Sequence, residues 1–118
     1  MSATQYHIWC DLRPGVADVD FADAVTGYLD RLLQDGFLTD WRLSRRKLGL
    51  GQPDLGEFHI IMEMEGLADL DEVFTAVSER TDPLESLHVA VNSKVTNFKA
   101  ALYRDFPDPH RMRGEERF

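Results

Sequence analysis

Two histidines and two carboxylates occupy positions of matching spacing in two strand-like segments. His7 and Asp11 are four residues apart in the first segment, and His59 and Glu63 are four apart in the second. If the two strands are parallel neighbours, all four side chains share one face of a sheet, because alternate residues of a strand point the same way. Two imidazoles with a carboxylate suit iron or zinc. The spacing matches no metal-binding motif, however, and we predict no metal site.

The histidines also have roles that need no metal. His7 or His59 could act as a general acid or base, because an imidazole titrates near neutral pH. The simpler alternative, which we favour, is a partly buried histidine that is hydrogen-bonded to a nearby carboxylate. His88 is expected on a short helix in a structural role, and His110 lies in the C-terminal tail.

The one basic cluster consists of Arg42, Arg45, Arg46 and Lys47, and a glycine-rich loop follows it. Arginine presents a planar fork that binds a carboxylate or phosphate with two hydrogen bonds. The run 48–51 lacks the glycine pattern of a nucleotide-binding loop. The alternative interpretation, favoured here, is an exposed strand end that pairs with the acidic excess of the chain.

The spacing of apolar residues predicts four strands and three helices. Alternation with a period of two indicates strands, and apolar residues three and four apart indicate amphipathic helices. The last strand has a helix as its competing interpretation, because its sequence contains good helix formers. The strands are expected over residues 6–12, 37–48, 57–64 and 95–104, and the helices over 18–34, 68–80 and 83–92.

This order of elements predicts an α+β protein with a ferredoxin-like split β-α-β sandwich. In that fold a four-stranded antiparallel sheet carries its helices on one face, and the first and third strands lie in the centre. A single domain is expected over residues 1–106. The segment 107–118 is expected to be a tail that is either flexible or packed on a partner subunit.

The predicted sheet has one apolar face and one mixed face. Even-numbered residues of three strands, among them Phe98 and Leu102, are expected beneath the helices together with Trp41 and Leu43. On the mixed face, aromatic side chains are costly to leave in water, whereas the charged ones resist a dry interior. We therefore predict a homodimer in which two sheets pack face to face as an α+β barrel; the alternative is a face left in water. The mixed face comprises His7, Trp9, Asp11, Arg42, Ser44, Arg46, His59, Ile61, Glu63, Lys99 and Tyr103.

Composition narrows the class of protein. The 118 residues carry a net charge of −8, which disfavours nucleic acid and anionic membranes as partners. No apolar run is long enough to span a membrane, and the first residues do not have the pattern of a signal peptide. The single cysteine, Cys10, fits a reducing cytoplasm, and it is expected to be a buried, inert thiol.

Several runs of the sequence resemble a family of short, uncharacterised bacterial proteins. The similarity covers about residues 6–109, and the family is similar to the dimeric α+β barrel superfamily. The resemblance implies a ferredoxin-like dimer; that superfamily includes small-molecule monooxygenases, isomerases and stress-response proteins that act on apolar or aromatic compounds. It implies no catalytic residue. The runs are 8–12, 45–51, 56–60, 91–93, 95–98 and 101–107.

These features favour a dimer that binds a small, largely apolar organic molecule, with a carboxylate as an option, and that needs no tightly held cofactor. Aromatic side chains would line a pocket in or beside the barrel. A non-enzymatic interaction or regulatory module is the alternative, a metal-dependent enzyme is a weaker one, and whether the protein is an enzyme stays open. The candidate residues are Trp9, Trp41 and Tyr103 as walls, His7 and His59 as polar contacts, and Arg42 or Arg46 for an anion.

Overall fold

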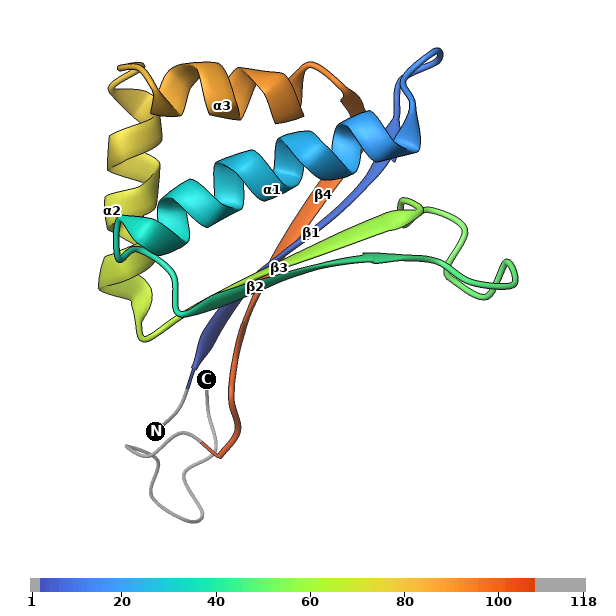
Figure 1. The fold of residues 1–118 in the computed structure, drawn as a ribbon. Helices are drawn as coiled ribbons and strands as arrows, with labels where there is room; N and C mark the ends of the chain where they lie inside the picture. The colour runs from blue at the N-terminus through green and yellow to red at the C-terminus, as the bar shows by residue number, and fades with distance from the viewer. Residues whose placement is uncertain (1–2, 108–118) are drawn as a thin grey trace.

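The structure is a computed structural model, and it describes residues 3–107 (Figure 1). Its elements follow the predicted order, and the helical alternative for the last segment is wrong because that segment is a strand. The predicted tail lies outside the described residues, apart from Pro107. The elements are β1 (Thr4–Leu12), α1 (Asp18–Gln34), β2 (Asp40–Arg45), β3 (Phe58–Met64), α2 (Leu67–Ser78), α3 (Leu84–Asn92) and β4 (Val95–Arg104).

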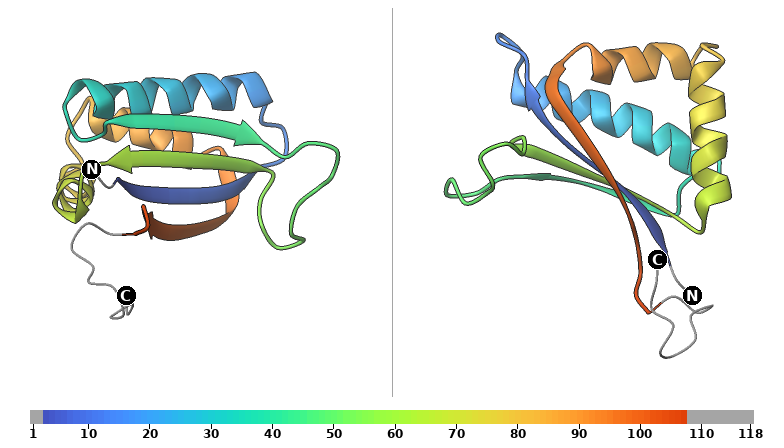
Figure 2. Two further views of the ribbon diagram at one scale, coloured as in Figure 1. Left: turned by 90° about the horizontal axis from the view of Figure 1, so that it is seen from below. Right: turned by 180° about the vertical axis from the view of Figure 1, so that it is seen from behind.

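The four strands form one antiparallel sheet in the order β2-β3-β1-β4. The predicted ferredoxin-like α+β fold is thereby confirmed, with the first and third strands in the centre (Figure 2). These two strands run antiparallel. The parallel arrangement that was considered for the two histidines and two carboxylates is therefore wrong. In the actual register Trp9 faces His59, and His7 faces Ile61.

Helices α1 and α3 lie side by side over one face of the sheet, and α2 stands across their ends (Figure 1). The buried residues of α1 are Phe21, Val25, Leu29 and Leu32, whose spacing of three and four places them on one side of the helix. The aspartates in its first turn stabilise the helix, because their negative charge interacts favourably with the positive N-terminal end of the helix dipole. No helix within residues 3–107 is long and apolar enough to cross a membrane.

The sheet contributes the other half of the core through alternate residues of its central strands. Phe58, Ile60, Met62 and Met64 are all buried under the helices. Cys10 is buried in the same layer, and burial raises the pKa of its thiol to about 11. The thiol therefore stays protonated near neutral pH, as the prediction of an inert cysteine requires.

Strand β4 differs from the prediction that its even-numbered residues lie beneath the helices. Phe98 and Leu102 are 55% and 50% exposed. The reason is position: β4 is an edge strand, and α1 and α3 lie toward the opposite, β2 side of the sheet (Figure 2). The three-and-four spacing of apolar residues in α2 also predicts burial of Phe74, but this side chain is 49% exposed because α2 stands at the end of the sheet.

Gly27, in the middle of α1, provides a first testable prediction. The sequence suggests close backbone packing at this glycine, but a Cβ there would lie 3.7 Å from Leu87 Cδ2, an ordinary van der Waals distance. We expect Gly27→Ala to raise the free energy of unfolding by about 0.5–1 kcal/mol, because alanine restricts the unfolded chain and favours the helix.

Urea unfolding at one protein concentration measures this effect. Gly36→Ala is the matched control, because Gly36 also has open space around it but has a φ of +85° that alanine adopts only with strain. The two substitutions should shift the midpoint in opposite directions. A lower midpoint for Gly27→Ala would show that the helix is packed more closely than the structure indicates.

Candidate functional site

The uncovered face of the sheet brings four of the predicted site residues together. His7 Nδ1 lies 2.9 Å from His59 Nε2, and we call these two residues the histidine pair. The ring of His59 stacks on Trp9 with 4.7 Å between centroids and 5° between planes. Tyr103 meets the His7 ring edge-on, with 4.7 Å between centroids. Burial lowers the pKa of both imidazoles, and His7 lowers that of His59 further.

The other three predicted residues are not part of this cluster. Trp41 lies on the helix-covered face, where its Nε1 donates a hydrogen bond of 2.9 Å to Asp30 on α1. Arg42 lies on the uncovered face opposite Ile61, next to the cluster. The guanidinium of Arg46 donates to the backbone carbonyl of Leu55, so this side chain ties β2 to the glycine-rich loop.

The two carboxylates do not contact the histidine pair. Asp11 accepts hydrogen bonds from the Glu57 N–H at 2.8 Å and from the Asn97 amide at 2.9 Å, and these bonds hold the pKa of its carboxyl below the usual range. Glu63 faces Gln5 on β1. Among residues 3–107 no three His, Cys, Asp or Glu side chains gather in a way that suits a metal ion.

Two hollows flank the histidine pair on this face. One of about 230 Å³ is lined by Trp9, His59, Arg46 and the glycine-rich loop. The other, of about 290 Å³, is lined by His7, Arg42 and neighbours on β2 and β3. Both are bordered by charged side chains, so neither resembles a site for a wholly apolar ligand.

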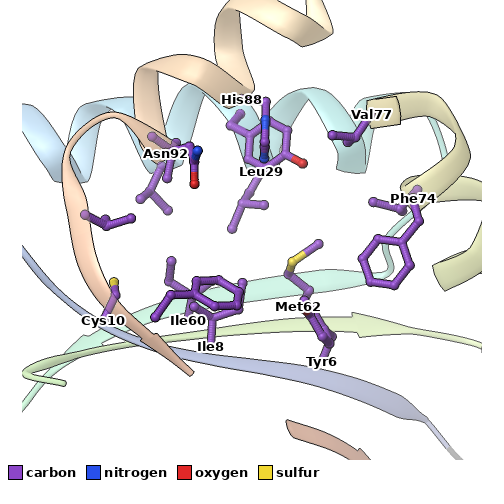
Figure 3. A pocket seen from close by; sticks show the side chains of 16 residues that line it. Tyr6, Ile8, Cys10, Leu29, Ile60, Met62, Phe74, Val77, His88 and Asn92 are labelled. Carbon is purple, nitrogen blue, oxygen red and sulfur yellow. The ribbon is translucent and has the colours of Figure 1, made fainter. Parts of the chain in front are cut away.

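An apolar cavity lies on the opposite side, between the sheet and the three helices (Figure 3). Its volume is about 150 Å³. Sheet residues form its floor, and the rings of Tyr6 and Phe74 meet edge-on at 5.6 Å beside it. It is lined by Tyr6, Ile8, Cys10, Val25, Tyr28, Leu29, Ile60, Met62, Val73, Phe74, Val77, His88, Val91, Asn92, Val95 and Phe98.

Polar groups gather on the helical wall of this cavity. His88 and Asn92 project from α3 toward the sheet (Figure 3), and the ring of Tyr28 on α1 lies 5.5 Å from that of His88. Burial raises the pKa of Tyr28 to about 12, so its hydroxyl stays protonated and able to donate a hydrogen bond. The wall thus offers a hydroxyl, an imidazole and an amide to a molecule held against an apolar floor.

Sequence reasoning did not identify this wall. The three-and-four spacing in α1 predicts Tyr28 as part of the apolar stripe of that helix, and His88 was expected in a structural role. One signal was present: His88 and Asn92 are four residues apart and therefore lie on the same side of a helix. Tyr28 of α1 reaches the same wall because α1 packs against α3, and the sequence alone does not show this packing.

Comparisons with solved structures find the same fold in proteins of very different sequence. A cofactor-independent oxygenase, SnoaB from Streptomyces nogalater, is 8% identical with a TM-score of 0.66, and the match covers 93% of this chain and 98% of that one. A hydroxynitrile lyase from Passiflora edulis is 10% identical with a TM-score of 0.66, covering 90% and 95%. A dimeric ferredoxin-like protein of unknown function from Jannaschia sp. CCS1 is 10% identical with a TM-score of 0.64, covering 86% and 97%.

At these identities the similarity establishes the fold and no activity. A comparison with curated proteins finds no match. The profile of one family, described as a family of unknown function (DUF6614), matches residues 3–118, which is nearly the whole chain. The resemblance to an uncharacterised ferredoxin-like family is therefore confirmed, and the protein belongs to the DUF6614 family.

Proposed function

We propose that the protein is a homodimer that binds a small, largely apolar organic molecule in the cavity between its sheet and its helices. The observation that carries this proposal is the composition of the cavity: a largely apolar floor, which includes Tyr6, faces a wall whose hydrogen-bonding side chains among the described residues are Tyr28, His88 and Asn92. Ligand sites in proteins combine apolar surface with a few polar groups in this way. An apolar cavity of about 150 Å³ holds roughly one benzene-sized ring.

The chemistry of the wall favours a neutral ligand. Within residues 3–107 no lysine or arginine lines the cavity, and Arg42 and Arg46 lie on the other face of the sheet. A carboxylate would therefore lose its hydration in the cavity without gaining a cation. A phenol, ketone or similar molecule would keep a hydrogen bond to Tyr28 or Asn92.

The named structural neighbours support small-molecule chemistry in this fold. Two of them are an oxygenase and a hydroxynitrile lyase, and others are described as dimeric ferredoxin-like proteins. A fold hosts many functions, so this support does not extend to a particular reaction. The lone Cys10 and the net charge of −8 support a place in the cytoplasm without nucleic acid or membrane partners.

A non-enzymatic interaction module is the second candidate. The observation that favours it is the aromatic and imidazole cluster of Trp9, His59, His7 and Tyr103, which lies on the uncovered face and outside the cavity. In that case the uncovered face serves self-association, and the cavity is only a packing defect. The two candidates differ in whether the cavity binds anything.

Filling the cavity tests the proposal. Val91 lines it, whereas Val89 on the same helix does not and is 47% exposed. With phenol as the probe and NMR titration as the measurement, we expect Val91→Phe to weaken binding by at least about tenfold, because the new ring occupies the space of the ligand. Val89→Phe should leave the affinity unchanged.

Val77→Phe fills the cavity from α2 and provides a second route if Val91→Phe does not fold. Toluene, which lacks the hydroxyl, should bind more weakly than phenol because Tyr28 and Asn92 then lose their partner. If neither probe shifts the resonances of cavity residues in the native chain, the module is the better description. Equal weakening by Val89→Phe and Val91→Phe would place the binding elsewhere.

A further inference from the structure

The histidine pair occupies the middle of the uncovered face. His7 and His59 lie on the two central strands, and their nitrogens are 2.9 Å apart, a hydrogen-bonding distance. The ring planes differ by 21° and the centroids are 5.1 Å apart, so the rings meet edge to edge. In this arrangement each nitrogen points at the other. Two imidazoles that share a metal ion would instead both point at a third position.

Such a pair is sensitive to protonation. An N–H···N bond needs one nitrogen that carries a proton and one that does not, and a fully charged imidazolium has a proton on both nitrogens. When both histidines are charged, two N–H groups face each other and the bond is lost. Burial lowers the pKa of both rings, which agrees with this reasoning, and coupled groups of this kind lose their protons in two separate steps.

The surroundings do not favour a second positive charge. The nearest charged residues on the two flanking strands are both positive: Lys99 on β4 pairs with Trp9, and Arg42 on β2 pairs with Ile61. The carboxylates lie toward the ends of the face, where Asp11 is bonded to Asn97 and Glu57 is paired with Arg45. The charged and titratable groups that share the face with the pair are Asp11, Asp40, Arg42, Arg46, Glu57, Glu63, Lys99, Tyr103 and, through its hydrogen bond to Gln5, Asp105.

The occupant that this face fits is a second copy of the chain. Asp40 and Glu63 face each other at one end of the face. At the other end Arg46 and Lys99 lie near Asp11, and Glu57 is paired with Arg45, so the positive charges are in slight excess there. A two-fold axis between two facing sheets, running across the strands, puts the acidic end of each copy over the end of its partner that carries the slight positive excess. The centres then meet, so the histidine pair of each copy is covered together with Trp9 and the half-exposed ring of Tyr103.

We propose that the histidine pair makes this self-association depend on pH, so that two copies bind face to face near neutral pH and separate as the imidazoles become charged. The inference rests on the homodimer of the proposed function and not on the cavity. Covering the face removes more water from the imidazoles, so the neutral form is favoured further in the dimer. The separated chains therefore take up more protons, and acid shifts the equilibrium toward them.

Sedimentation equilibrium tests this inference on the full chain. The dimer should have its full stability at and above about pH 6.5, the ordinary pKa of histidine, and weaken below it as the pH falls through the lowered pKa values of the two imidazoles. We expect the dissociation constant of the native protein to rise at least about tenfold between about pH 7.5 and about pH 5.5. The double variant His7→Gln/His59→Gln, which keeps polar side chains but cannot titrate, should lose this dependence.

His88→Gln is the matched control, because it removes a histidine from the other side of the sheet. It should keep the native pH profile, and circular dichroism at both pH values checks that each variant stays folded. An NMR titration of the native imidazoles needs no variant, and it should show two steps for His7 and His59 that shift with protein concentration.

Three results would overturn the inference in distinguishable ways. A dimer of constant affinity across this pH range removes the role of the histidine pair and leaves the homodimer. A chain that is monomeric at neutral pH removes the homodimer as well, while the cavity proposal still depends on the Val91→Phe experiment. A dimer that dissociates on adding EDTA and re-forms with Zn²⁺ shows that the pair is a set of metal ligands rather than a titrating pair.

Discussion

Replacing Gly56 with alanine should lower the free energy of unfolding by about 3 kcal/mol or more. Gly56 is buried where the glycine-rich loop returns to the sheet, and a Cβ at this position would collide with the backbone of Cys10. Backbone atoms of a central strand cannot move aside as the end of a side chain can. The substitution must therefore displace the loop or bend β1.

Urea unfolding at a fixed protein concentration measures this loss. Gly66→Ala is a suitable comparison, because nothing lies within 4 Å of the added Cβ and the backbone there is extended. We expect it to change the free energy of unfolding by less than about 1 kcal/mol. Similar midpoints for the two alanine variants would contradict the close approach of Gly56 to Cys10.

Phe21→Ala should also be strongly destabilising, by about 3–5 kcal/mol. Phe21 is completely buried at the start of α1, and its ring meets that of Phe58 on β3 edge-on at 5.1 Å. Removing the ring leaves a void between helix and sheet in addition to the lost burial of apolar surface. This contact holds the N-terminal half of α1 on the sheet.

Phe106→Ala is the control for Phe21→Ala, because Phe106 is 73% exposed. Its effect on the free energy of unfolding should stay within about 0.5 kcal/mol. The slope of the transition against urea concentration should be alike in both variants if each unfolds in one step. A loss for Phe21→Ala as small as that for Phe106→Ala would mean that α1 is not packed as described.

The elements of the fold could be predicted because each has a clear period in the sequence. Helix α1 has the predicted bounds, and β3 begins one residue later than predicted. Strand β2 is shorter than predicted, Asp40–Arg45, since the residues on either side form turns and loops. The period of two also assigned faces correctly within each central strand. It could not show whether a helix covers those faces, which is why Phe98 and Leu102 are exposed despite their pattern.

The candidate site was harder to predict because it depends on pairs of elements. The histidine pair requires the antiparallel register of β1 and β3, and the sequence does not contain that register. His7 and His59 were correctly placed on one face, but the carboxylates were expected beside them and lie apart. The cavity wall requires the packing of α1 on α3, which brings Tyr28 to His88. Neither arrangement is encoded in a local motif.

The position of β4 also has a consequence for handling the protein. Its ten residues form one of the two edges of the sheet, so one side of this strand has N–H and carbonyl groups without a neighbouring strand among the described residues. Such a border can add strands from other molecules and start aggregation. Lys99 and Arg104 place positive charge along it, which opposes the stacking of identical copies. Variants that neutralise these two side chains should therefore be stored dilute and watched for fibrils.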